Sequence, residues 1–108
     1  MENHKHIYTV TELAREARML LESAFSAVWL EGEISNFISH SSGHMYFSLK
    51  DEGALINCAM FKGENHYLRF MPKDGQKVLC LGRVSIYDKQ GKYQFYVCLL
   101  YTSDAADE

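Results

Sequence analysis

The chain has 108 residues, of which 47% are hydrophobic, and it carries a formal net charge of -3. This length suits one domain with its own core, and the single proline argues against disorder. No apolar run approaches the ~20 residues of a membrane span and no signal-peptide pattern opens the chain, so we expect no membrane association. The acidic balance does not favour a nucleic-acid partner. However, Asp104, Asp107 and Glu108 supply three of the 14 acidic residues, and the other 11 match the 11 basic residues.

The three cysteines, Cys58, Cys80 and Cys98, have no CxxC spacing. Cys58 and Cys80 fall at inward positions of predicted strands, which indicates buried, reduced thiols rather than metal ligands. We therefore expect an intracellular, cytoplasmic protein.

Residues 1–8 are predicted to be a loose lead-in to an amphipathic helix over residues 9–24. Thr9 and Glu12 match a capping box, in which each side chain bonds the other residue's backbone N–H. Such a helix must bury its apolar stripe, and we expect it to plug one end of the barrel that follows. The alternative is a contact with another chain or domain. The apolar positions recur at helical spacing: Leu13, Ala17, Leu20, Leu21 and Ala24.

Three successive β-strands are predicted between Val28 and Lys62, because inward and outward residues alternate along each of them. The inward positions are Val28, Leu30, Gly32 and Ile34, then Phe47 and Leu49, then Ile56, Cys58 and Met60. The outward positions mix aromatic, amide and cationic side chains, which suits a stacking platform for unpaired bases.

Two more strands are predicted after a short helix, in which Leu68 and Phe70 point inward, and a turn at residues 72–75. The fourth strand covers residues 76–88, with a sharp bend at Gly82. A hairpin turn at residues 89–92 leads to a fifth strand, in which the inward residues are Tyr93, Phe95 and Val97. This β-β-β-(short α)-β-β order predicts a mainly β fold, a five-stranded, partly open Greek-key OB-fold barrel with an N-terminal α-helix.

The usual ligand face of this fold is formed by the second and third strands, flanked here by loops at residues 38–43 and 89–92. We predict that Tyr46 and Phe61 stack on bases there, while cations follow the backbone and amides and hydroxyls form hydrogen bonds. Trp29 could instead pack under the N-terminal helix, and Tyr87 and Tyr96 could be ordinary cross-strand pairs. The predicted nucleic-acid-binding residues are Trp29, Asn36, Phe37, His44, Tyr46, Ser48, Lys50, Asn57, Phe61, Lys62, Arg83, Tyr87, Gln94 and Tyr96.

No hydrolytic motif occurs in the chain: it lacks HExxH, a P-loop, Gly-x-Ser-x-Gly and a paired-carboxylate motif. We therefore predict no catalytic residue, and no cofactor is predicted. His40 and His44 flank a Ser-Ser-Gly loop, so their spacing does not place both rings on one face, and no metal site is predicted. His44 is interpreted as a polar contact at the loop end.

Several segments in order resemble the N-terminal domain of the large subunit of bacterial exodeoxyribonuclease VII. They are YTVTELAREARMLLE, VWLEGEISNF, SGHMYFSLKD, CAMFKG and GKYQFYV, and the resemblance covers residues 8–97. It implies a single-stranded DNA-binding OB domain in a larger exonuclease that degrades single-stranded DNA to oligonucleotides. It also implies that the catalytic domain lies outside this chain and that a small subunit binds through the missing C-terminal region.

Residues 98–108 depart from the pattern of that family. One back-translation of CLLYTSDAADE resembles a transposon-end adapter used in library preparation. Our hypothesis is that this segment is adapter-derived, which leaves residues 9–97 as the OB domain. The nucleotide sequence tests this, because unrelated codons would contradict it.

The sequence thus predicts a non-catalytic module that binds single-stranded DNA. Two other functions stay open at this point. An RNA-binding OB appendage of a tRNA synthetase would prefer RNA to DNA. A protein-interaction module would bind a partner chain through its aromatic face and would not bind a strand at low salt.

Overall fold

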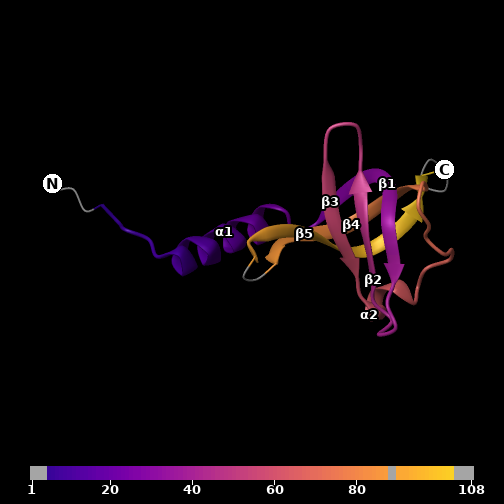
Figure 1. The fold of residues 1–108 in the computed structure, drawn as a ribbon, viewed down its shortest axis with the longest axis horizontal. Helices are drawn as coiled ribbons and strands as arrows, with labels where there is room; N and C mark the ends of the chain where they lie inside the picture. The colour runs from indigo at the N-terminus through magenta and orange to yellow at the C-terminus, as the bar shows by residue number, and fades with distance from the viewer. Residues whose placement is uncertain (1–4, 88–89, 104–108) are drawn as a thin grey trace.

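The computed structural model describes residues 5–87 and 90–103, and its core is a closed five-stranded barrel (Figure 1). The strand order around the barrel is β1-β2-β3-β5-β4. All neighbouring pairs are antiparallel except β3 with β5, which close the barrel through a short parallel contact. The mainly β barrel with an N-terminal helix is as predicted. The elements are α1 (Val10–Ala24), β1 (Val28–Ser39), β2 (Met45–Lys50), β3 (Leu55–Met60), α2 (Lys62–Asn65), β4 (Lys77–Tyr87) and β5 (Lys92–Thr102).

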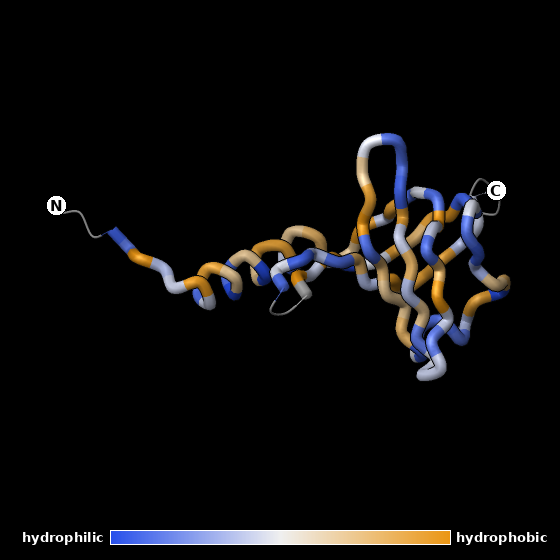
Figure 2. The backbone as a smooth tube through the Cα atoms, in the orientation of Figure 1, coloured by the Kyte–Doolittle hydropathy of each residue, from blue (hydrophilic) through white to orange (hydrophobic). Residues whose placement is uncertain are grey.

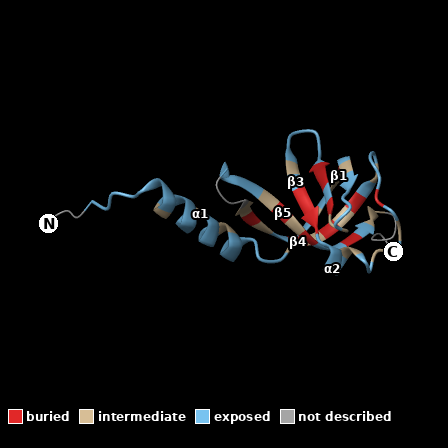
Figure 3. Cartoon of the chain, turned by 60° about the horizontal axis from the view of Figure 1, so that its bottom comes forward, coloured by how far each residue is buried: buried red, intermediate tan, exposed pale blue. Residues whose placement is uncertain are grey.

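The core lies inside this barrel, where buried residues from all five strands meet (Figure 3). Leu68 and Phe70, from the segment that links α2 to β4, pack against it as the sequence predicts. The turn before β4 also has the predicted chemistry, with Pro72 buried and Gly75 at a φ of 87°. The core side chains are Ile34, Met45, Phe47, Leu49, Cys58, Met60, Val78, Cys80, Phe95, Val97 and Leu100.

Gly82 lies where β5 leaves no room for a side chain on β4. A Cβ at this position would lie 2.8 Å from Cζ of Phe95 and would also meet the carbonyl oxygen of Tyr96. The β4–β5 register shifts beside it, since Leu81 pairs with Leu99 whereas Gly82 pairs with Val97. The bend that the sequence predicts at this glycine therefore corresponds to a bulge, and only a residue without a side chain fits.

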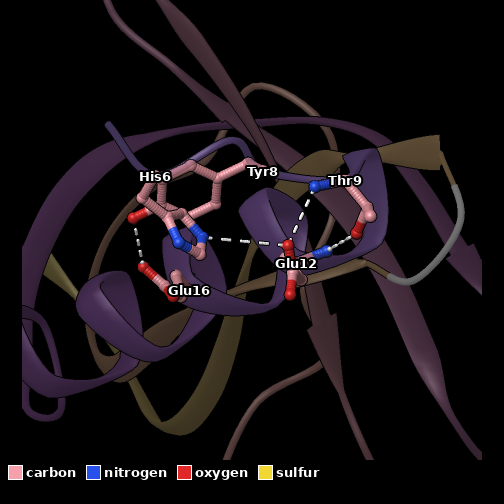
Figure 4. A network of polar contacts seen from close by, with 5 residues as sticks. All are labelled: His6, Tyr8, Thr9, Glu12 and Glu16. Carbon is pink, nitrogen blue, oxygen red and sulfur yellow. Dashed lines mark hydrogen bonds and ion pairs between the residues drawn. The ribbon is translucent and has the colours of Figure 1, made fainter. Parts of the chain in front are cut away.

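Helix α1 begins with the predicted capping box (Figure 4). The N–H of Glu12 donates to Oγ1 of Thr9 at 3.0 Å, and the N–H of Thr9 donates to Oε1 of Glu12 at 2.9 Å. One turn further, the hydroxyl of Tyr8 donates to Oε1 of Glu16 at 2.8 Å. These bonds satisfy two backbone donors at the N-terminus and fix where the helix begins.

The predicted role of α1 as a plug for the barrel is wrong, because the helix projects away from it (Figures 1 and 2). The described residues of α1 include no buried one, and Leu20 is 71% exposed. Hydrogen bonds join its C-terminal end to β4: the N–H of Val84 donates to the carbonyl of Phe25, and the hydroxyl of Ser85 donates to Glu22. Because both anchors lie on β4, the helix axis follows the β4–β5 hairpin outward instead of crossing the barrel mouth.

Strand β5 differs from the prediction at both ends. The sequence predicts that Tyr93 points inward, but this residue is 54% exposed, because it pairs only with Ile86 in the two-stranded part of the hairpin, before β5 reaches β3. At the other end the strand continues to Thr102, which pairs with Val78, and places Leu100 in the core. The hypothesis that residues 98–108 are adapter-derived concerns their origin and stays a prediction.

Among the described residues, no helix combines the length and the apolar character that a membrane crossing requires.

Candidate nucleic-acid interface

A row of side chains crosses four strands on the outer face of the barrel. Tyr46 of β2 pairs with Ala59 of β3, Ala59 pairs with Tyr96 of β5, and Tyr96 pairs with Arg83 of β4. Residues that pair directly across strands present their side chains on the same face. The barrel thus aligns side chains that lie far apart in the sequence, with the small Ala59 between two tyrosines.

The rings of His44, Phe61 and Tyr96 form a chain of contacts beside this row. Phe61, directly after β3, lies with its ring centroid 5.7 Å from that of Tyr96, and the centroid of His44 lies 5.1 Å from that of Phe61. At the other end, Cζ of Arg83 lies 4.8 Å from the Tyr96 centroid, within cation–π range. We call Tyr46, Phe61, Tyr96, His44 and Arg83 the aromatic row.

The aromatic row is open to solvent at two of its rings. Tyr46 is 37% exposed and Phe61 is 38% exposed, whereas Tyr96 is half-buried between its neighbours. Exposed rings on a sheet face can stack on unpaired bases without reading their sequence, because every base has a π-face. The predicted outward orientation of Phe61 agrees with the structure, although Phe61 is the N-cap residue of α2 and not a strand residue.

Polar groups lie along one side of the row, two residues from its members on β2, β3 and β5. The hydroxyl of Tyr96 donates to Oε1 of Gln94 at 2.9 Å, and Oγ of Ser48 donates to Oδ1 of Asn57 at 3.3 Å. Asn57 is exposed, so its amide remains accessible for contacts with a ligand. The prediction that Ser48 faces a ligand is wrong, since only 5% of this residue is exposed, and its role is to orient Asn57.

The loop between β1 and β2 is fastened to α2. The ring Nδ1 of His44 accepts a bond from the N–H of Lys62 at 3.0 Å, which in the neutral imidazole leaves the proton on Nε2 as a donor. Asn65 donates from Nδ2 to the carbonyl oxygens of Gly43, at 2.7 Å, and Met60, at 3.2 Å. No sequence pattern indicates this role of Asn65, because Gly43 lies in the β1–β2 loop and Met60 is the last residue of β3.

The histidines of this loop are occupied by local bonds. Nδ1 of His40 accepts from the N–H of Ser42 at 3.0 Å and lies 2.9 Å from its hydroxyl, while Nδ1 of His44 is bonded to Lys62. Within the described part of the chain, no three His, Cys, Asp or Glu side chains gather as a metal site would require.

Two predicted contact residues lie in a bulge of β1 that reverses the inward–outward alternation. The β1–β2 register shifts between Ser35 and Ile38, and Asn36 takes a φ of 54°. Phe37 therefore turns inward, packs against the core and contacts the ring of Phe47 at 6.3 Å, so its predicted place on the ligand face is wrong. Asn36 stays exposed at the turn of the bulge.

Two other predicted aromatic contacts are not part of the aromatic row. Trp29 is 52% exposed and stacks on Tyr101 of β5 at 6.2 Å, so it neither joins the row nor packs under α1. Tyr87 is the last residue of β4, and its side chain lies outside the described residues.

The three predicted cations separate into two locations. Arg83 belongs to the aromatic row and Lys62 follows Phe61, so both border the exposed rings. Lys50 lies four residues beyond Tyr46 on β2, roughly 13 Å away at the strand rise. It lines a shallow groove with four carboxylates, those of Glu31, Glu33, Asp51 and Glu52, and with Lys77. Of the three predicted cations, Lys62 and Arg83 are therefore the two that lie beside the aromatic row.

The thiols of Cys58 and Cys80 lie in the core inside the barrel. Burial raises the pKa of each thiol, that of Cys80 to about 12. They stay protonated and are structural, as the sequence predicts, while Cys98 is exposed.

Curated relatives include the exodeoxyribonuclease 7 large subunits of Tolumonas auensis and Shewanella woodyi. The first is 50% identical over 91 residues, 84% of this chain and 20% of the relative. The second is 51% identical over 92 residues, 85% of this chain and 21% of the relative. The chain thus spans about a fifth of the length of the curated relatives it matches.

Solved structures share the fold at low sequence identity. Asparaginyl-tRNA synthetase from Pyrococcus horikoshii matches with a TM-score of 0.60 and 14% identity, over 82% of this chain and 21% of the synthetase chain. A replication protein A heterotrimer bound to ssDNA contains a chain that matches with a TM-score of 0.56 and 12% identity, over 70% of this chain and 56% of that one. Residues 8–100 also match the model of the family described as the OB-fold nucleic acid binding domain. The chain therefore belongs to the OB-fold nucleic-acid-binding domain family.

Proposed function

We propose that this chain is the single-stranded DNA-binding domain of an exodeoxyribonuclease VII large subunit. The aromatic row is the observation that carries this proposal, because it combines accessible rings with flanking cations on one face of the barrel. Similarity to large subunits of this enzyme favours DNA as the strand, since the low-identity structures include both DNA-bound and synthetase proteins.

In this proposal the strand crosses β2, β3 and β5 with its bases against Tyr46 and Phe61. The backbone runs beside Lys62 and Arg83, which attract it without reading sequence. The Nε2 proton of His44 and the amide of Asn57 supply hydrogen bonds at the edge. Because Lys50 is surrounded by carboxylates, it contributes little to this track.

The domain itself holds the strand and does not cut it. Cleavage belongs to a hydrolase domain elsewhere in the full-length protein, and the small subunit binds through the C-terminal region of that protein. The two unpaired, buried thiols Cys58 and Cys80 support a reducing, cytoplasmic location.

Anisotropy titrations with labelled oligo-dT, oligo-rU and duplex DNA at low salt test the proposal. We expect oligo-dT to bind more tightly than duplex DNA and at least as tightly as oligo-rU. A clear preference for oligo-rU would assign the domain to RNA. If none of the three ligands binds, the proposal that this domain binds nucleic acid is wrong.

A further inference from the structure

Two amide side chains beside the aromatic row are held in fixed orientations. Oγ of Ser48, a residue that is only 5% exposed, donates to Oδ1 of Asn57 at 3.3 Å. In the same way, the hydroxyl of Tyr96 donates to Oε1 of Gln94 at 2.9 Å. Each amide therefore turns its carbonyl oxygen toward the protein, and its NH2 group, on the opposite branch of the planar amide, points away from that bond.

Both NH2 groups are open to solvent. Neither nitrogen donates to another residue in the described part of the chain. Asn57 is exposed, whereas Gln94 is half-buried. Among the side chains that the structure describes, Oγ of Ser103 is the one buried polar atom without a partner, so the unbonded nitrogen of Gln94 reaches the surface. The two amides thus present donors to a ligand.

These donors lie where bases would stack. Asn57 is the diagonal cross-strand neighbour of Tyr46, at about 7–8 Å between Cα atoms. Gln94 bonds Tyr96, whose ring centroid lies 5.7 Å from that of Phe61. Both amides are therefore beside the face that carries the two exposed rings, within reach of the edges of bases stacked there.

An amide that only donates distinguishes bases by the groups on their edges. An unconstrained Asn or Gln reads adenine with two bonds, since it accepts from the N6 amino group and donates to N7. Here both carbonyl oxygens are already engaged, which disfavours this pair of bonds. The keto oxygens O4 of thymine and uracil and O6 of guanine accept from an NH2 group, whereas the amino groups N6 of adenine and N4 of cytosine are donors and oppose it.

We propose that Asn57 and Gln94 give this domain a preference for the keto bases thymine, uracil and guanine over the amino bases adenine and cytosine. Ser48 and the hydroxyl of Tyr96 are positioning groups, because they act on the ligand by fixing the orientation of the two amides. This preference rests on the strand binding proposed above. It adds to stacking and phosphate contacts that do not distinguish bases.

Anisotropy titrations of labelled oligo-dU and oligo-dC test the preference, at low salt and at a mildly alkaline pH where cytosine is neutral. The two strands share a backbone and a single pyrimidine ring, so the comparison isolates the keto and amino groups. One net hydrogen bond corresponds to about 2- to 12-fold in affinity, and we expect oligo-dU to bind more tightly than oligo-dC by about this factor.

Variants assign the preference to the two amides. Asn57→Leu combined with Gln94→Leu should make the affinities for the two strands nearly equal. The control Gln90→Leu removes an exposed amide beside α1 and should leave the affinity ratio unchanged. Asn57→Asp replaces the donor by an acceptor, so it should weaken binding of both strands by charge repulsion and shift the ratio toward oligo-dC. Ser48→Ala should reduce the ratio, because the Asn57 amide can then rotate.

Thermal melts verify that each variant is folded, and the negative results have separate meanings. Equal binding of oligo-dU and oligo-dC by the parent chain would overturn the base preference and leave strand binding intact. A ratio that the double variant does not change would overturn the role of the two amides. If neither strand binds, the proposed function is refuted and the base preference is refuted with it.

Discussion

Replacing Phe61 by alanine separates binding from folding at the centre of the aromatic row. Each stacked base is worth about 1–3 kcal/mol, so the variant should bind oligo-dT about 5- to 150-fold more weakly. Folding should also lose free energy, because the ring contacts His44 and Tyr96, and two aromatic pairs contribute about 1–3 kcal/mol together. That loss exceeds the ~0.5 kcal/mol typical of exposed sites, and it should lower Tm by about 4–8 °C for each kcal/mol.

The assay is an anisotropy titration of labelled oligo-dT, at a temperature where a thermal melt shows every variant folded. Tyr93→Ala is the matched control, since Tyr93 is also an exposed aromatic residue but lies in the hairpin, away from the aromatic row. It should bind like the parent chain. If Phe61→Ala binds as tightly as the parent in its folded fraction, the ring is structural only and base stacking at this position is refuted.

Four further predictions concern charge, packing, thiols and catalysis. Lys62→Ala should weaken binding to all strand sequences about equally, and it should make the slope of log affinity against log salt concentration shallower by about 0.7, because one phosphate is no longer neutralised. Titrations from low to high salt measure this slope. An unchanged slope would mean that Lys62 is merely solvated. Gly82→Ala should destabilise the barrel by about 1–3 kcal/mol in urea unfolding, because its Cβ meets the Phe95 ring, whereas Gly63→Ala has open space and should be near neutral. Between pH 9.0, the ordinary pKa of the thiol, and about 12, the unfolded chain loses protons that Cys80 keeps in the fold. The unfolding free energy should therefore fall by about 1.4 kcal/mol per pH unit for this thiol, and urea midpoints that stay constant over this range would contradict its burial. Finally, the chain should leave end-labelled single-stranded DNA intact with or without Mg²⁺, and cleavage that disappears on substitution of one of its residues would reveal a site that the sequence does not indicate.

Local patterns in the sequence were sufficient for most of the secondary structure. The capping box at Thr9 and Glu12 places the start of α1, because both partners lie within one helical turn. Alternation placed Ile34, Phe47 and Cys58 in the core, because a strand presents every second side chain to the same face. The turn at Gly75 and the bend at Gly82 were also predicted from the sequence, because each requires a backbone geometry that favours glycine.

Other features were decided by contacts between distant segments. Phe37 turned inward because a bulge in β1 reversed the alternation, and Ser48 was covered by neighbours on adjacent strands. The assembly of Tyr46, Tyr96 and Arg83 into one row depends on the closure of β3 against β5, a long-range pairing that no local pattern encodes.

The helix shows the same division most clearly. Its length, its cap and its apolar stripe follow from the spacing of residues within one segment, and the sequence alone determined them. The direction of the helix axis does not follow from this spacing. It is set by the hydrogen bonds that Val84 and Ser85 of β4 donate to Phe25 and Glu22. These bonds form only when the barrel brings β4 beside the end of the helix. Amphipathicity thus determined that α1 has a face to bury, and the tertiary structure decided that this face does not lie on its own barrel.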